Sequence, residues 1–147
     1  MWDKISAEEL TQLYRTADVF VLPSKGEGWG LPLIEAAAHG LPIITTMYSA
    51  QTEFLQHIES SVVPVEYDLG PITCPEFRHF YPTRDGNWGN WAVPRVDSVA
   101  NALIHARENL SELAAQARIN ANIVRQRYNW NQCADQALQT LQQRGLL

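Results

Sequence analysis

The sequence predicts an α/β fold: a partial Rossmann-like parallel sheet of about three strands, flanked by helices and followed by a helical C-terminal tail. Three short apolar runs, at 19–23, 41–46 and 61–65, alternate with segments of helical periodicity. The first run is wholly apolar, which is typical of a parallel strand that is buried on both faces. A glycine-rich segment directly after the first run is typical of the turn that joins a strand to a helix in such folds.

The chain of 147 residues has the size of one domain. Within it we distinguish an α/β region (1–65), an irregular connection (66–96) and a set of C-terminal helices (97–147). The net charge is −5 and no stretch is strongly basic, which argues against a nucleic-acid partner. No apolar run approaches the ~20 residues that a membrane helix needs. Cys74 and Cys133 lie far apart and no secretory signal is evident, so we expect free thiols in a cytoplasmic protein.

The first predicted helix spans 7–17 and begins with a capping box. Ser6 and Glu9 have the spacing at which a hydroxyl and a carboxylate satisfy each other's backbone amides. Its apolar face is formed by residues at helical spacing: Leu10, Leu13, Tyr14 and Ala17. The run 19–23 follows directly and is the first predicted strand.

The second predicted helix, 31–39, follows the glycine-rich loop 24–30. Pro32 stands in its first turn, where a missing amide costs little, and Gly40 stands where a left-handed C-cap belongs. A further helix around 51–58 separates the second and third strands.

Three helices are predicted after the connection, at 97–109, 111–127 and 129–145. Asp97 and Ser111 are expected to cap the first two. We expect the apolar faces of these helices to pack on the sheet or on one another; they contain Val99, Leu103, Ala106, Leu113, Ala117, Ala137, Leu138 and Leu141.

The loop 24–30 and the helix after it predict an anion site. The first amides of a helix have no internal acceptor, and the helix dipole adds partial positive charge there. Gly28 and Gly30 allow the backbone to approach a ligand closely. The combination suits a phosphate or a diphosphate.

Two carboxylates accompany this loop. Glu27 lies before the helix and Glu35 lies inside it, with seven residues between them. Both are expected near the carboxyl end of the first strand, where ligands of open α/β sheets bind. A carboxylate in the helix can accept two hydrogen bonds from the diol of a ribose, and one on the loop can hold sugar hydroxyls. The alternative is a pair of solvated surface acids.

The segment 22–45 resembles glycosyltransferase family 4, the group 1 transferases of GT-B fold. The blocks that carry the resemblance are Leu22-Pro23-Ser24, the run from Glu27 to Ala36, and Gly40-Leu41-Pro42. Glu27 and Glu35 match the E-x7-E motif of that family. Two later blocks look like its closing elements: Trp91–Pro94 and Tyr128-Asn129-Trp130.

The resemblance implies the donor-binding part of a retaining glycosyltransferase, which moves a sugar from a nucleotide-sugar to an acceptor hydroxyl without a metal or another cofactor. It implies that Glu35 binds the donor ribose, and that Glu27 contacts hydroxyls of the transferred sugar in a catalytic role. Residues at the start of the helix would contact the sugar and the diphosphate and stabilise the departing nucleotide: Gly28, Trp29, Gly30 and Leu31.

The sequence departs from the family in one respect. The family's donor domain begins with earlier strands, whose loops bring a basic pair, usually Arg and Lys, onto the diphosphate. This sequence starts after them, and Lys4, Arg15 and Lys25 are the only basic residues nearby. We therefore expect a domain truncated on its N-terminal side, inactive without the missing half.

The same departure leaves one edge of the strand at 19–22 open. Open edges invite pairing with another chain, so we expect a homo-oligomer or a partner polypeptide. The alternative function is a non-catalytic module that binds a nucleotide-sugar or another protein.

Several other side chains have both a structural and a functional interpretation. His39 is expected to complement the helix dipole, Lys25 to be a solvated charge and Trp130 to pack. For Trp29 a sugar contact and a packing role are equally open, and Glu53 is expected to cap a helix in preference to reaching a phosphate. Four aromatic residues are expected to pack the connection against the domain in preference to stacking on an acceptor sugar: Phe80, Tyr81, Trp88 and Trp91.

Overall fold

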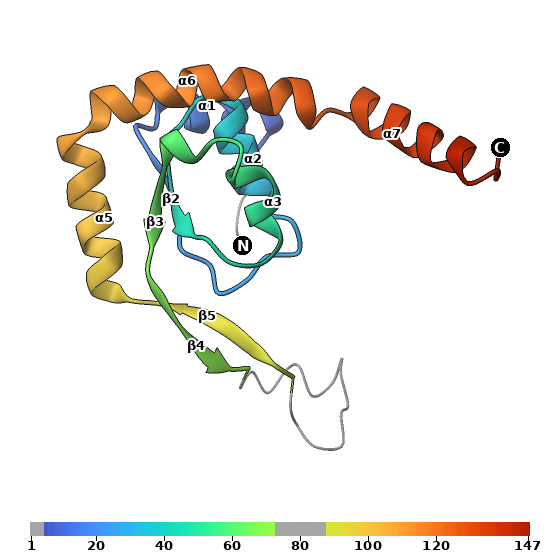
Figure 1. Ribbon diagram of the computed structural model, residues 1–147. Helices are drawn as coiled ribbons and strands as arrows, with labels where there is room; N and C mark the ends of the chain where they lie inside the picture. The colour runs from blue at the N-terminus through green and yellow to red at the C-terminus, as the bar shows by residue number, and fades with distance from the viewer. Residues whose placement is uncertain (1–4, 73–87) are drawn as a thin grey trace.

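The computed structural model describes residues 5–72 and 88–147 and confirms the α/β fold (Figure 1). Its central element is a parallel sheet with the strand order β1-β2-β3. The strands are β1 (Phe20–Leu22), β2 (Ile43–Thr46) and β3 (Val62–Val65). All three predicted strands are therefore confirmed, each slightly shorter than its apolar run.

Helices flank this sheet and form the C-terminal tail. They are α1 (Ala7–Thr16), α2 (Leu31–Ala38), α3 (Thr52–Leu55), α5 (Val96–Glu108), α6 (Leu110–Arg127) and α7 (Trp130–Gln143). The helix expected over 51–58 is reduced to α3, between the 3₁₀ turns η1 (Ser49–Gln51) and η2 (Glu59–Ser61). The chain must turn back into β3 within a few residues, which ends the helix early.

Several local signals in the sequence are confirmed. The Ser6 hydroxyl accepts the amide hydrogen of Glu9 at 3.1 Å, and the Glu9 carboxylate accepts that of Ser6 at 2.7 Å. Gly40 has φ +79, as a left-handed C-cap requires. The Asn129 side chain caps α7 by accepting the amide hydrogen of Gln132 at 3.0 Å.

The two expected helix caps at Asp97 and Ser111 are wrong. The N-cap residues of α5 and α6 are Arg95 and Asn109, and neither makes a side-chain capping bond. Asp97 and Ser111 lie in the first turns instead. A single residue joins α5 to α6, so no extended residue precedes α6 from which Ser111 could cap it.

The sheet is covered on both faces, because neighbouring residues of β2 enter different cores. Ile43 packs with residues of α2, α3, α6 and the segment between α3 and η2, which include Leu33, Ala37, Phe54, Leu55, Ile58 and Val124. Ile44 packs with residues of β3, α5 and α6, which include Val63, Val65, Ala102, Ala106 and Leu113. Both isoleucines have no exposed surface, which agrees with the burial of every residue of β2 without alternation.

The interpretation of residues 66–96 as an irregular connection is wrong on both sides of the segment that lies outside the described residues. β4 (Tyr67–Pro71) pairs antiparallel with β5 (Asn90–Pro94), and the ribbon extends beyond the sheet (Figure 1). Prolines suggested a loop, but Pro71 and Pro94 occupy the ends of the strands, where a missing amide breaks little of the ladder. Cys74, Phe80 and Tyr81 lie outside the described residues.

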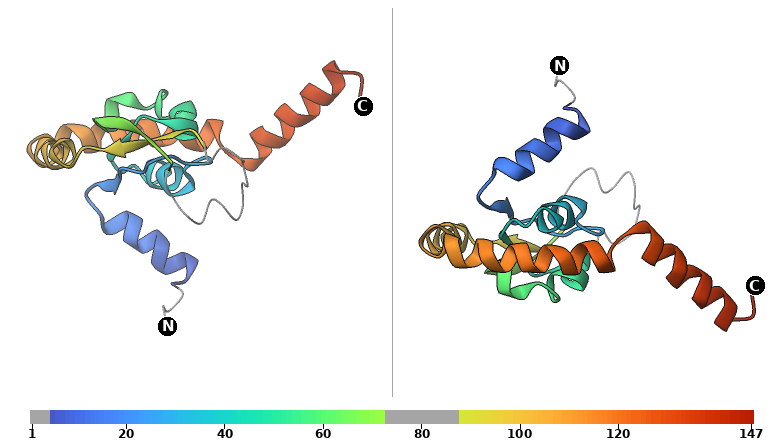
Figure 2. Two further views of the ribbon diagram at one scale, coloured as in Figure 1. Left: turned by 90° about the horizontal axis from the view of Figure 1, so that it is seen from below. Right: turned by 90° about the horizontal axis from the view of Figure 1, so that it is seen from above.

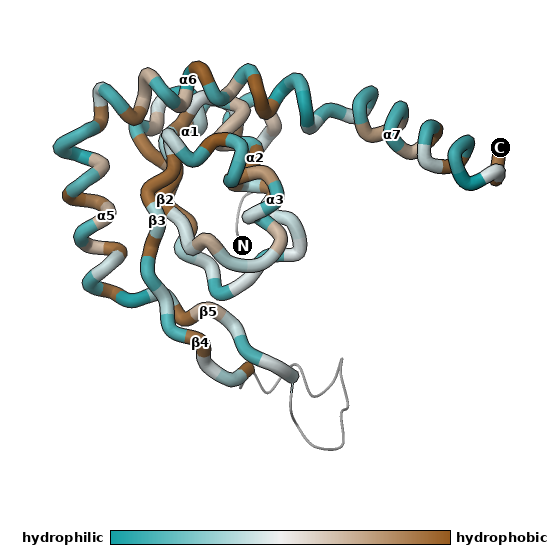
Figure 3. The backbone as a smooth tube through the Cα atoms, viewed as in Figure 1, coloured by the Kyte–Doolittle hydropathy of each residue, from teal (hydrophilic) through white to brown (hydrophobic). Residues whose placement is uncertain are grey.

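The packing expected for the last helix is also wrong. No residue of α7 is buried, and Leu138 is 50% exposed. Figure 2 shows α7 extending away from the sheet and its helices in both views, and Figure 3 shows hydrophilic residues along its length. The chain leaves α6 at Tyr128 with a non-helical backbone, which redirects α7. On α5, Leu103 is likewise 43% exposed.

Among the described helices, none is both long and apolar enough to cross a membrane. Cys133 on α7 is an exposed free thiol.

Candidate functional site

The glycine-rich loop joins the carboxyl end of β1 to the N-terminus of α2, as the sequence predicts (Figure 1). Gly30 is the N-cap residue and has φ +86, so the turn into α2 uses the left-handed region. A Cβ atom at this position would lie 3.2 Å from both Gln51 Cβ and Leu33 Cδ1. Glycine is therefore required at residue 30 by backbone conformation and by space.

The start of α2 presents unpaired amides. Leu33 and Ile34 both donate to the Gly30 carbonyl, at 3.0 and 3.1 Å, and Pro32 has no amide hydrogen. The amides of Gly28, Trp29, Gly30 and Leu31 donate no hydrogen bond to any residue that the structure describes. These N–H groups lie at the positive end of the helix dipole, where an anion is favoured.

Glu27 lies at the beginning of this turn and is half-buried. Its backbone amide donates to the Ser49 hydroxyl at 2.8 Å. Its Cγ atom is 3.8 Å from the place of a Cβ on Gly30, so the side chain folds toward the start of α2. Its carboxylate has no hydrogen-bond partner among the described residues.

Glu35 lies one turn further along α2 on an exposed position. Its Oε2 accepts a hydrogen bond from the Tyr14 hydroxyl at 3.0 Å, which ties α2 to α1. Burial raises the pKa of Tyr14 to about 12, with further contributions from the hydrogen bond and the negative charge of Glu35. The second carboxylate oxygen of Glu35 has no partner in the described structure and remains available for a ligand.

Trp29 packs through one part of its ring and exposes another. Its ring centroid is 5.9 Å from that of Phe54 and 6.2 Å from that of Tyr128. The residue is nevertheless 38% exposed. Trp29 therefore has a packing contact, and the rest of its side chain is exposed to solvent beside the loop.

The ribbon is attached to the loop by Lys25 and Trp91. The Lys25 ammonium lies 4.3 Å from the centroid of the Trp91 ring, and the Lys25 carbonyl accepts the Ala92 amide hydrogen at 2.9 Å. The Tyr48 hydroxyl adds a bond of 3.0 Å to the Asn90 carbonyl. Trp91 thus has a packing role, and Lys25 is not simply a solvated charge.

The remaining candidate residues of the sequence differ in their contacts and in their exposure. His39 Nδ1 donates to the Glu35 carbonyl at 2.8 Å near the end of α2, and its ring stacks on Tyr14. Glu53 lies in the first turn of α3 and makes no side-chain cap. Trp130, expected to pack, is 89% exposed because it starts the projecting helix α7. Trp88 is half-buried.

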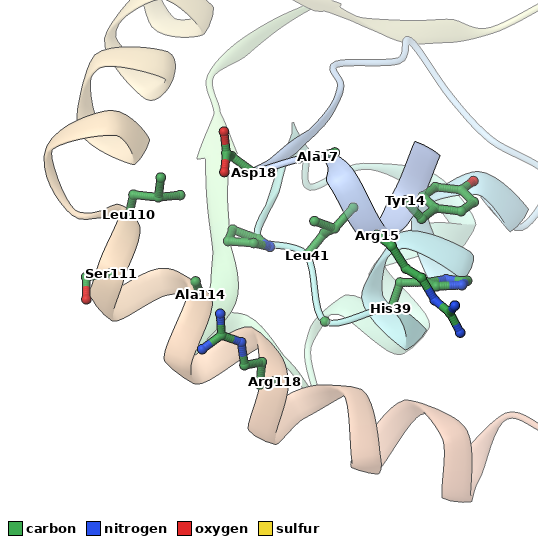
Figure 4. A pocket seen from close by; sticks show the side chains of 12 residues that line it. Tyr14, Arg15, Ala17, Asp18, His39, Leu41, Leu110, Ser111, Ala114 and Arg118 are labelled. Carbon is green, nitrogen blue, oxygen red and sulfur yellow. The ribbon is translucent and has the colours of Figure 1, made fainter. Parts of the chain in front are cut away.

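A cavity of about 580 Å³ opens at the other end of the sheet (Figure 4). Tyr14, Arg15, His39 and Arg118 are among the residues that line it, and it lies beside the segments that enter β1 and β2. Neither Glu27 nor any residue of 28–31 reaches this cavity. Ligands of open α/β sheets bind at the carboxyl ends of the strands, so the loop is the better candidate site.

Sequence reasoning missed three residues that support the site: Tyr14, Ser49 and Gln51. Tyr14 lies on the apolar stripe of α1, where a core role is the natural interpretation. Ser49 and Gln51 carry no motif, and only the fold brings them beneath the loop. Among the described residues no group of three or more His, Cys, Asp or Glu side chains is placed to hold a metal ion.

Comparisons with known proteins agree on one class. Residues 2–68 match a family model described as "Glycosyl transferases group 1". The chain is 31% identical to mannosylfructose-phosphate synthase of Agrobacterium fabrum, over 51% of this chain and 17% of that protein. It is 28% identical to O-antigen chain mannosyltransferase B of Escherichia coli, over 78% of this chain and 27% of that protein.

A shorter match of higher identity is to the serotype-specific mannosyltransferase WbdA of Escherichia coli, 52% identical over 27% of this chain and 5% of that protein. The chain thus spans well under a third of the length of each of these relatives. No solved structure matches the chain.

Proposed function

We propose, from the match of residues 2–68 to the family model described as "Glycosyl transferases group 1", that the chain forms the donor-binding part of a retaining glycosyltransferase. The enzyme would move a sugar from a nucleotide-sugar to an acceptor hydroxyl. The observation that carries this proposal is the set of unpaired amides at the start of α2, with Glu27 on one side and Glu35 on the other.

The amides of residues 28–31 would bind the diphosphate. These N–H groups have no hydrogen-bond acceptor among the described residues, and the helix dipole makes this end of α2 partly positive. As the bond between the sugar and the diphosphate breaks, negative charge grows on the leaving group. Preorganised N–H donors stabilise that growing charge more than they stabilise the intact donor, which is the condition for catalysis.

Glu35 would bind the ribose of the donor. Tyr14 holds one carboxylate oxygen in place at 3.0 Å, which fixes the rotamer of the side chain. The other oxygen is free to accept a ribose hydroxyl. A carboxylate with one oxygen anchored loses less rotational freedom on binding than one that is fully solvated.

Glu27 would contact the hydroxyls of the transferred sugar. It is half-buried, and its side chain leans toward the start of α2, whose amides would hold the diphosphate. The negative charge of Glu27 close to the anomeric centre would favour the positive charge that develops on the sugar ring as the leaving group departs. This is the catalytic role that we propose for it.

The proposal also concerns the cations at the diphosphate, the need for a metal and the cellular location. The cations that neutralise the diphosphate would come from a partner polypeptide or another part of the protein, because the nearby Lys25 ammonium is engaged on Trp91. No metal would be required, so EDTA should leave donor binding unchanged. We further propose a cytoplasmic location, in which the exposed thiol of Cys133 would stay reduced.

The second candidate is a non-catalytic module that binds a nucleotide-sugar or another protein. The exposed helix α7 and the free edge of β1 favour it, because both leave apolar side chains uncovered. The two candidates differ in whether transfer occurs once the missing cations are supplied.

The test is a ligand-observed NMR panel of UDP, GDP and ADP with their common sugar conjugates, including GDP-mannose. We expect selective binding of one nucleotide family. Glu35→Ala should weaken both the nucleotide and its sugar conjugate by about 10-fold or more, as the loss of a charged hydrogen-bond acceptor does. Glu27→Ala should weaken only the conjugate.

Glu108→Ala serves as the matched control, since this glutamate is exposed on α5 and far from the loop in the chain. It should bind every ligand as the wild type does. Silence across the panel from a folded wild-type protein would overturn the proposed donor site.

A further inference from the structure

A chain of hydrogen bonds runs beneath the glycine-rich loop. The Gln51 side chain is fully buried, and its Nε2 donates to the Thr46 carbonyl at the end of β2, at 3.1 Å. Its Oε1 accepts a hydrogen bond from the Ser49 hydroxyl at 3.0 Å. The Ser49 oxygen in turn accepts the amide hydrogen of Glu27 at 2.8 Å. The chain therefore connects the sheet to the loop residue that carries the candidate catalytic carboxylate.

Ser49 adopts an unfavourable backbone conformation to take part in this chain. Its φ is +63, and it is the only residue other than glycine with a positive φ in the described ranges 5–72 and 88–147. A non-glycine residue in this region is disfavoured by about 1–2 kcal/mol. Glycine would avoid the strain but has no hydroxyl, and the hydroxyl is the group that contacts Glu27.

Gln51 also contacts the other end of the same loop. A Cβ atom on Gly30 would lie 3.2 Å from Gln51 Cβ, so the backbone of Gly30 rests directly on this side chain. Segment 49–51 thus supports the loop at Glu27 through Ser49 and at Gly30 through Gln51. Between these two points lie Gly28 and Trp29, which make no backbone hydrogen bond to any described residue.

We propose that Ser49 and Gln51 are positioning residues, which hold Glu27 and the start of α2 in the geometry that the sugar of the donor requires. The identity of the ligand rests on the proposed function. Neither residue needs to touch the donor. A loop with glycines at 26, 28 and 30 has many alternative conformations, and the two contacts select one of them before the ligand arrives.

Ser49→Gly separates this role from a structural one. The substitution removes the hydroxyl and relieves the backbone strain, so we expect its melting temperature to stay at or near that of the wild type. Ser98→Ala is the matched control. The Ser98 hydroxyl accepts the Glu66 amide hydrogen at 2.9 Å, which is the same kind of bond at a distance from the loop.

The first measurement is amide hydrogen exchange on the full chain without ligand. In Ser49→Gly the Glu27 amide should exchange about three- to tenfold faster, as expected for the loss of one hydrogen bond, while the Glu66 amide is unchanged. In Ser98→Ala the pattern should be reversed. Unchanged exchange at Glu27 in Ser49→Gly would overturn the proposal.

The second measurement compares the affinities for GDP and GDP-mannose, or for another nucleotide and conjugate pair that the wild type binds. Ser49→Gly should weaken the conjugate about three- to tenfold and leave the free nucleotide unchanged, because Glu27 faces the sugar. Equal loss for both ligands, or no loss, would overturn the positioning role. If the wild type binds no member of the panel, the proposed function fails, and the exchange rates alone decide whether Ser49 holds Glu27.

Discussion

At the residue scale, the backbone conformations of Gly30, Gly40 and Ser49 shape the region around the loop. Gly30 and Gly40 bound α2 with φ values of +86 and +79, so both ends of this helix use the left-handed region. The motif predicts glycine at these two places because the same turn chemistry recurs in related folds. Nothing in the sequence predicts a positive φ at Ser49, which follows from a contact with Glu27 across 22 residues.

Gly30→Ala tests the requirement at the N-cap of α2. We expect the free energy of unfolding to fall by about 1–3 kcal/mol, from the left-handed backbone and the contacts that the new methyl group would make with Gln51 and Leu33. Gly28→Ala is the control, because a Cβ there meets nothing within 4 Å. It should change stability by less than about 1 kcal/mol. Urea denaturation measures both, and equal effects would contradict the argument.

Tyr14→Phe tests the link between α1 and Glu35 through the pH dependence of stability. The pKa of Tyr14 is raised from 10.0 to about 12 in the folded state, so the unfolded chain loses this proton first as the pH rises. The stability that the raised pKa represents is complete below about pH 10 and is lost as the pH rises through about 12. The wild type should therefore lose more stability than Tyr14→Phe over this interval. Parallel curves in urea titrations between these pH values would show that the hydroxyl does not titrate as described.

At the scale of elements, the apolar face of a helix did not decide whether the helix is buried. α6 carries Leu113, Ala117, Ala121 and Val124 in the core, whereas α7 has similar periodicity and no buried residue. The difference arises because α6 lies across α2 and η2, while α7 starts after the bend at Tyr128 and runs away from them (Figure 2).

Leucine-to-alanine changes in the two helices should differ accordingly. Leu113→Ala is expected to lower the free energy of unfolding by about 2–5 kcal/mol, because the residue is 8% exposed and packs in the core with Ile44. Leu138→Ala should cost less than about 0.5 kcal/mol, as is usual for exposed positions. Thermal and chemical unfolding of both variants give the comparison. A large effect of Leu138→Ala would mean that α7 packs against something in solution.

The β4–β5 ribbon shows how a proline-rich segment can hold regular structure. Its strands are joined at the base by Arg95, which pairs with Asp68 at 2.7 Å and Glu66 at 3.3 Å on the surface. The guanidinium of Arg95 holds the pKa of Asp68 below its usual value, mainly through their hydrogen bond. Arg95 and Asp68 are 27 positions apart in the chain, and no local sequence pattern predicts their pairing.

At the scale of the whole molecule, the sheet has a free edge at β1. Among the described strands β1 pairs only with β2, and Val21 on this edge is 38% exposed. An unpaired parallel strand presents N–H and C=O groups to any suitable neighbour. The molecule therefore carries a potential surface for a second copy or for a partner chain.

We predict that the isolated chain self-associates through this edge. Val21→Lys should shift the sedimentation profile toward the monomer, because a lysine on an edge strand opposes pairing with another strand. Leu69→Lys on β4 replaces another exposed apolar residue, 60% exposed, and should leave the profile unchanged. A wild type that is monomeric at all concentrations, or an equal response of the two variants, would contradict this prediction.

The sequence by itself determined the order and type of the α/β elements, the glycine-rich turn, the place of Glu27 on that turn and the place of Glu35 on the helix that follows. These features depend on neighbours in the chain: apolar runs, caps, and glycines at positions with left-handed backbone. Only the tertiary structure decided the support of Glu27 by Ser49 and Gln51, the anchoring of Glu35 by Tyr14, the ribbon, and the exposure of α7. Each of these results from contacts, or from missing contacts, between segments far apart in the chain, and local periodicity carries no information about them.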